Sequence, residues 1–84
     1  MSSDEILAQV RDIIAEILDQ PGLKIDRDTI AEDVRDWDSF NHINIVVAVQ
    51  ASFGIKIHAA EVEQLRKVAE LVDLIERKLA AKKK

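Results

Sequence analysis

The apolar residues at the start of the chain recur at the spacing of an amphipathic helix. They stand one, three and four positions apart, at Ile6, Leu7, Val10, Ile13, Ile14, Ile17 and Leu18. Ser3 is a suitable N-cap, and Pro21-Gly22 would stop the helix. The pattern therefore predicts a helix over about residues 3–19.

A second apolar segment, over about residues 39–53, contains no charged residue. Its β-branched residues favour a strand, but a lone strand would have no partner. Asp38 or Ser39 offers an N-cap, and Gly54 is a suitable stop. Helical spacing also fits Ile43, Val46, Val47, Gln50 and Ala51. We therefore expect a helix that is apolar around most of its circumference and is the central, most buried one.

The remaining residues predict two further helices and a long loop. An amphipathic stripe covers about residues 67–80, and about residues 59–65 are typical of a short helix or a single turn. The loop over about residues 20–38 is longer than an ordinary connection, so apolar residues must anchor it. These anchors are Leu23, Ile25, Ile30, Val34 and Trp37. The lysine-rich tail at 81–84 is expected to fray. The sequence thus predicts an all-α fold, a small four-helix bundle with three main helices and one short helix, in a single domain over residues 1–84.

Composition narrows the class of protein. A chain of 84 residues buries one modest core. It contains no cysteine, which excludes a disulfide framework, thiolate metal ligands and a cysteine nucleophile. Its first residues lack the basic flank and apolar run of a signal peptide, and no apolar segment approaches membrane-spanning length. We therefore expect a cytoplasmic monomer that does not insert into membranes.

The charge balance indicates the kind of partner. Sixteen acidic and twelve basic residues give a net charge of −4, and three of the basic residues are the terminal lysines. An acidic surface repels phosphate backbones, so a nucleic-acid partner is not expected. The same surface attracts proteins that carry basic patches.

Ser39 stands between Asp38 and Phe40 at the start of the apolar segment, where several chemistries would use a hydroxyl. A hydrolase would need a base oriented by a third group. His42 would lie one turn past Ser39 on a helix with nothing to hold it, and no G-x-S-x-G elbow surrounds the serine. Two histidines without cysteine do not favour a zinc site, and Asp26-x-Asp28 lacks the later ligands of a calcium loop. No catalytic residue and no metal site are predicted.

Two interpretations of Ser39 remain on local grounds. The serine could simply cap the helix, as most serines before a helix do. Alternatively, an exposed hydroxyl at a helix N-terminus is a favourable place to mount a phosphate, because backbone N–H groups and the helix dipole favour an anion there. The uncharged helix behind it could shelter an apolar chain.

The arrangement as a whole resembles the acyl carrier proteins over nearly the full length of the chain. It has a first amphipathic helix, a long loop, an Asp38-Ser39-Phe40 motif opening an apolar helix, a Phe53-Gly54-Ile55 turn, a short helix and a final helix. The resemblance implies that Ser39 receives 4′-phosphopantetheine from coenzyme A through a phosphopantetheinyl transferase. The terminal thiol of that arm would carry acyl groups as thioesters, in a protein that catalyses nothing itself. The implied partners are acyl-loading, condensing or acyl-transferring enzymes of fatty acid, polyketide or related lipid biosynthesis.

Three positions depart from the pattern of that family. Phe40 stands where leucine is usual, and Asn41 and Asn44 stand where many fatty-acid carriers have acids. Steering of basic partners must then come from acids elsewhere, such as Glu32, Asp33, Asp36 and Asp38 in the loop, or Glu61 and Glu63. We therefore expect a specialised stand-alone carrier. Residues 35–37 lack the Gly-Gly of peptidyl carriers, which makes that subtype less favoured.

Two further expectations concern the core and the rival class. Ile43, Val46 and Val47 are expected to pack in the core and to part for an acyl chain, so Val47→Ala should cost about one to a few kcal/mol. The rival interpretation is a small helical interaction module without a prosthetic group, which binds an amphipathic partner helix. Modification of Ser39 distinguishes the two.

Overall fold

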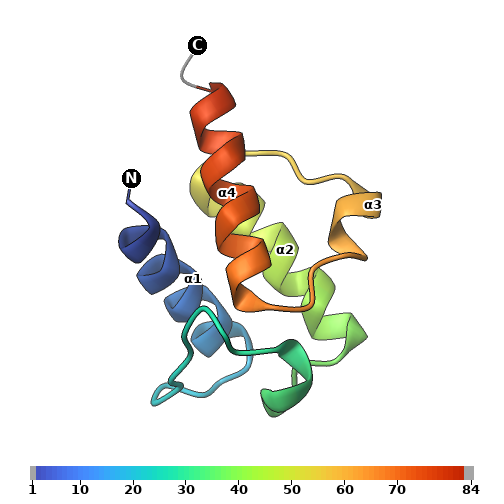
Figure 1. The fold of residues 1–84 in the computed structure, drawn as a ribbon. Coiled ribbons are helices and arrows are strands. Elements are labelled where there is room, and N and C mark those ends of the chain that lie inside the picture. Colours follow the sequence, from blue (N-terminus) through green and yellow to red (C-terminus); the bar gives the residue numbers. More distant parts are fainter. Residues whose placement is uncertain (1, 83–84) are drawn as a thin grey trace.

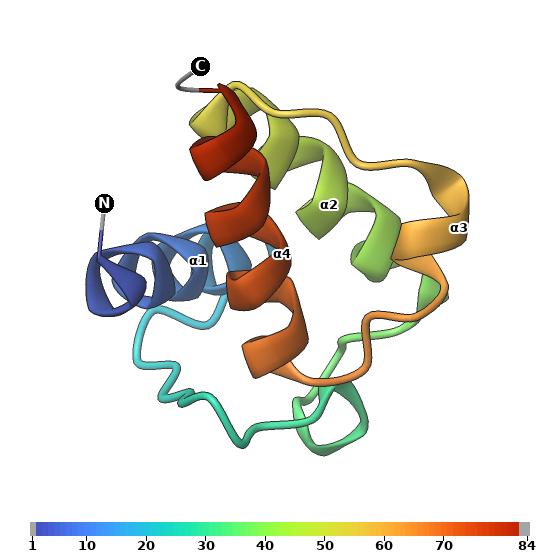
Figure 2. The same ribbon diagram turned by 45° about the horizontal axis from the view of Figure 1, so that its top comes forward.

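The computed structural model describes residues 2–82, and its regular elements in this range are helical apart from one isolated β-bridge. The helices are α1 (Ser3–Ile17), the 3-10 turn η1 (Ala31–Asp33), α2 (Ser39–Phe53), α3 (Ala59–Val62) and α4 (Val68–Lys82). Helix α1 packs against both α2 and α4. Figures 1 and 2 show the three long helices together, with α3 at one edge and the long loop across the base. The predicted all-α four-helix bundle is confirmed.

Helix α1 begins at residue 3 as predicted, but its N-cap differs from the prediction by one residue. Ser2, and not Ser3, is the N-cap: its Oγ accepts from the N–H of Glu5, while the Glu5 carboxylate accepts from the N–H of Ser2, both at 3.2 Å. The side chain of Ser3 instead donates to Glu76 of α4. The helix also ends at Ile17, because Asp19 adopts a left-handed φ of 54°.

Helix α2 has the bounds that the sequence pattern predicts, but its surroundings differ. Ile45, Val46, Val49 and Phe53 are buried. The opposite face is exposed to solvent, with exposed fractions of 74% for Phe40, 58% for Ile43 and 56% for Val47. The expectation that Ile43 and Val47 belong to the core is therefore wrong. The expectation that this helix is the most buried one is wrong too, because α4 has five buried residues and α2 has four. The physical reason is that one side of α2 joins a single core with the buried residues of α1 and α4, which leaves the other side to solvent.

The last two helices also depart from their predicted limits. Helix α3 ends at Val62 because the chain tightens into turns, in which the N–H groups of Gln64 and Leu65 donate to carbonyls three residues back. Helix α4 extends to Lys82, into the tail that was expected to fray. The Lys82 ammonium donates to the carbonyl of Gly54 at 2.8 Å. Residues 83 and 84 of that tail lie outside the described residues.

The long loop is anchored to the core and to the start of α4. Val34 is buried, and Leu23, Ile25 and Trp37 pack against the core. Backbone hydrogen bonds of 2.9 Å join Ala31 N–H to the Arg66 carbonyl and Val68 N–H to the Thr29 carbonyl. An ion pair of 2.8 Å between Arg27 and Asp73 adds a third contact. Among residues 2–82, no helix combines the length and the apolar character needed to cross a membrane.

Candidate functional site

Ser39 is the exposed first residue of α2, and its neighbours hold the turn that presents it. The Asp38 carboxylate accepts from the backbone N–H of Asn41 at 2.8 Å and is the N-cap of the helix. The Asn41 side chain donates to the carbonyl of Asp36 at 2.9 Å. Because Asp38 supplies the cap, α2 does not need the hydroxyl of Ser39.

An open groove of about 860 Å³ lies beside Ser39. One wall comes from η1, the end of the loop and the first turns of α2; the other comes from α3, the α3–α4 connection and the first turn of α4. Its apolar lining residues are Ile30, Trp37, Ile43, Val62 and Leu65. Charged groups of both signs also line it, including Glu63 and Arg66. Ile30, which was expected to anchor the loop, thus lines this groove and does not pack into the core.

A hydrogen-bonded bridge that the sequence analysis missed crosses the groove. The indole N–H of Trp37 donates to Nδ1 of His42 at 3.0 Å, and the two rings are stacked with centroids 6.0 Å apart. Nδ1 is therefore the acceptor, which assigns the proton to Nε2, 3.1 Å from the carbonyl of Val62. His42 is half-buried and is held by these two hydrogen bonds, whereas the sequence analysis found nothing to hold it. With both nitrogens engaged, it does not act as a base toward Ser39.

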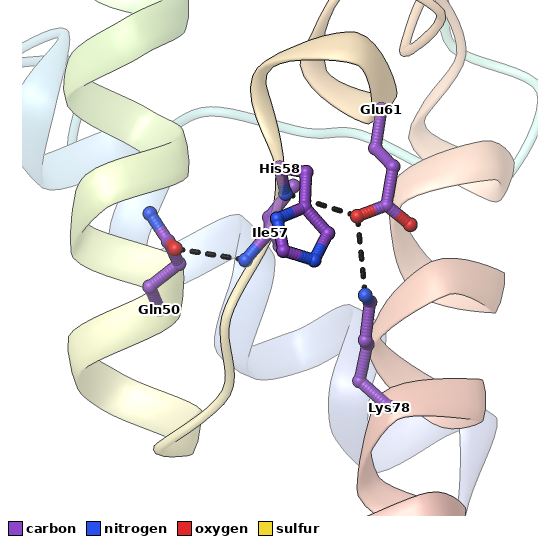
Figure 3. Close-up of polar contacts among 5 residues, drawn as sticks. All are labelled: Gln50, Ile57, His58, Glu61 and Lys78. Carbon is purple, nitrogen blue, oxygen red and sulfur yellow. Dashed lines mark hydrogen bonds and ion pairs between the residues drawn. The ribbon is translucent and has the colours of Figure 1, made fainter.

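Polar contacts hold the N-terminal end of α3 between α2 and α4 (Figure 3). The Gln50 side chain of α2 accepts from the N–H of Ile57 at 2.8 Å. The Glu61 carboxylate accepts from the N–H of His58 at 2.9 Å and from Lys78 of α4 at 3.1 Å. The His58 N–H, and then the Lys78 ammonium, lower the pKa of the Glu61 carboxyl.

Comparisons with known proteins identify the family. The model of the family described as "Phosphopantetheine attachment site" matches residues 8–75. The acyl carrier protein of Thermosynechococcus vestitus is 33% identical over 82 residues, covering 96% of this chain and 100% of that protein. The chain belongs to the acyl carrier protein family. The acyl carrier protein of Acidothermus cellulolyticus is also 33% identical, with 89% of each chain covered.

Solved structures agree with this membership of the acyl carrier protein family. The solution structure of the holo acyl carrier protein from Geobacter metallireducens superposes with a TM-score of 0.83 at 33% identity, over 90% of this chain and 87% of that one. The crystal structure of the acyl carrier protein from Thermotoga maritima, at 23% identity and a TM-score of 0.82, supports the fold alone. The predicted prosthetic group, 4′-phosphopantetheine, is confirmed as the group of this family.

Proposed function

We propose that Ser39 carries the 4′-phosphopantetheine arm and that the protein is a stand-alone carrier of acyl thioesters. The observation that supports this assignment is the position of Ser39. It is exposed, it is the first residue of α2, its capping role is taken by Asp38, and it opens onto the groove of about 860 Å³. When bound, the arm supplies a terminal thiol that holds an acyl group as a thioester.

The start of α2 suits a phosphodiester on Ser39. The first N–H groups of an α-helix have no acceptor within the helix and, together with its dipole, favour an anion. The N–H of Asn41 is already used by Asp38, which leaves those of Ser39 and Phe40 nearest to such an anion. The protein itself binds and orients; the bond-making steps belong to its partner enzymes.

The surface around Ser39 indicates the chemistry of those partners. Phe40, Ile43 and Val47 form an exposed apolar strip along α2, and we call these three residues the α2 strip. Exposed carboxylates of the loop, Asp36 and Asp38 among them, lie at its Ser39 end. We propose that the transferase and the acyl-handling enzymes of fatty acid, polyketide or related lipid biosynthesis meet the strip with an apolar patch beside basic residues. Neutral Asn41 and Asn44 support a specialised partner set.

Intact mass measurement tests the proposal. The unmodified protein is incubated with coenzyme A, magnesium and a broad-specificity phosphopantetheinyl transferase. We expect the wild type to gain one phosphopantetheine and Ser39→Ala to gain none. Ser52→Ala removes an exposed serine at the far end of α2 and should load like the wild type. An unmodified wild type would refute the assignment and leave the interaction module as the better interpretation. A Ser39→Ala variant that still gains the group would refute Ser39 as the attachment site.

A further inference from the structure

The two walls of the groove are joined at its two ends by different kinds of contact. At one end, backbone hydrogen bonds of 2.9 Å join the residues around Ile30 to those around Lys67, where the isolated β-bridge lies. At the other end, the His42 side chain joins Trp37 on one wall to Val62 on the other. A single imidazole therefore makes the hydrogen-bonded contact between the two walls at this second end.

Helix α3 depends on that imidazole at its C-terminal end. The helix has four residues, none of them buried, so polar contacts contribute much of what holds it. Its N-terminal end is held by Gln50 and by the Glu61–Lys78 pair (Figure 3). Its C-terminal residue, Val62, is only half-buried, and its carbonyl contacts His42. Loss of the His42 contact would loosen this end of α3, where Val62 would keep only its packing against the core and the hydrogen bond from Leu65, while the other end keeps its polar contacts.

We propose that His42 is a positioning residue, which as the Nε2–H tautomer holds α3 against Trp37 and so keeps the groove beside Ser39 narrow enough to cover a bound acyl thioester. The effect on cargo rests on the proposed carrier function, whereas the bridge itself does not. This tautomer alone accepts from the indole N–H and donates to the Val62 carbonyl at the same time. Any change that removes the acceptor or the donor opens the second end of the groove.

Two variants of His42 separate positioning from simple packing. His42→Leu puts an apolar side chain of similar size at this position and removes both hydrogen bonds, so the Trp37 N–H loses its acceptor and the Val62 carbonyl keeps only the N–H of Leu65. His42→Gln keeps an acceptor oxygen and a donor nitrogen on one terminal group. A positioning role predicts that His42→Gln keeps the contact between Trp37 and Val62 and that His42→Leu loses it. A packing role predicts that Leu is the better tolerated of the two.

The bridge is tested first in the protein without its arm. Trp37 is the only tryptophan of the chain, so tryptophan fluorescence reports on the surroundings of this one residue of the bridge. We expect acrylamide quenching to rise by about twofold in His42→Leu and to stay near the wild-type value in His42→Gln, because loss of the bridge exposes the indole. Nitrogen-15 NMR should find the proton of His42 on Nε2. Unchanged quenching in His42→Leu, or a proton on Nδ1, would overturn the proposal.

The cargo effect is tested in the protein loaded with an octanoyl thioester. We measure the rate at which hydroxylamine cleaves the thioester, with circular dichroism to show that each variant is folded. We expect His42→Leu to be cleaved about five to ten times faster than the wild type, equivalent to about 1 kcal/mol of lost shielding, and His42→Gln to match the wild type. Equal rates in all three proteins would refute the covering role. If Ser39 takes no arm, the proposed function fails and the quenching experiment alone decides the bridge.

Discussion

The carboxylate of Asp38 lies 2.8 Å from the backbone nitrogen of Asn41 and caps α2, so the neighbouring Ser39 has no share in the cap. We therefore expect Asp38→Ala to lower the free energy of unfolding by about 1 kcal/mol. Asp38→Asn keeps an acceptor oxygen and should cost much less, and Ser39→Ala should change the value by less than about 0.5 kcal/mol. Urea denaturation followed by circular dichroism measures all three. A loss in Ser39→Ala equal to that in Asp38→Ala would contradict the geometry.

Two valines on the same helix provide a second, matched test. Val49 is fully buried, whereas the side chain of Val47 is 56% exposed. We expect Val49→Ala to cost about 1 to 3 kcal/mol through lost burial and the cavity left behind. Val47→Ala should cost less than about 0.5 kcal/mol. The same denaturation experiment decides, and equal losses in the two variants would show that α2 is oriented differently.

Phe40, the most exposed residue of the α2 strip, links the surface to function. We expect Phe40→Ala to lower kcat/KM for arm transfer by about tenfold, since a central aromatic contact is worth 1 to 2 kcal/mol at an interface. Its 74% exposure predicts little change in stability. Initial rates of mass gain at several protein concentrations give kcat/KM. Wild-type rates for this variant would exclude the strip from the transferase contact.

Gly54 ends α2 with a left-handed φ of 64°, which L side chains adopt at a cost. We expect Gly54→Ala to lower the free energy of unfolding by about 1 to 2 kcal/mol, and Gly54→Asn to lower it less. A Cβ at this position would also lie 2.6 Å from the Lys82 ammonium, but that flexible end can move. The double variant Gly54→Ala/Lys82→Ala should therefore regain little. If the double variant regained the full free energy of unfolding, the loss in Gly54→Ala would come from the contact with the Lys82 side chain and not from backbone strain.

Glu61 makes a predictable contribution to the pH dependence of stability. The N–H of His58 and the ammonium of Lys78 lower the pKa of its carboxyl below the ordinary value of 4.5. A lowered pKa in the folded state stabilises the protein above pH 4.5, and this stabilisation is lost as the pH falls through the lower, folded-state value. The stability difference between wild type and Glu61→Gln should thus be constant from pH 7 to about 5 and shrink below about 4.5. Glu63→Gln, at a nearby exposed position, is the charge-matched control. If the stability difference between wild type and Glu61→Gln grew as the pH fell, the pKa of Glu61 would be raised and not lowered in the folded protein.

Features determined by short-range signals were accessible from the sequence. The limits of α2 follow from a capping carboxylate at Asp38 and a left-handed glycine at Gly54, both adjacent to the helix. The true cap of α1 had a readable signal as well, because Ser2 and Glu5 have the spacing of a capping box. The prediction of Ser3 as the cap does not use that pair.

Features determined by long-range packing were not accessible. Helix α2 is apolar on nearly all sides, so its composition does not tell which face α1 and α4 will cover, and Val47 was placed on the wrong side. The bridge through His42 joins Trp37 to Val62, which lies twenty residues from His42. A half-buried indole N–H needs an acceptor, and that requirement was the one available hint.

The contact between Lys82 and Gly54 places the last turn of α4 at the C-terminal end of α2. Ser39 begins the same fifteen-residue helix, so it lies about 22 Å away along the axis. A resin, dye or fusion partner fixed to the end of α4 would therefore occupy the opposite pole from the serine. Immobilised in this orientation, the protein would display the end that carries Ser39, the proposed attachment site, to enzymes flowing past.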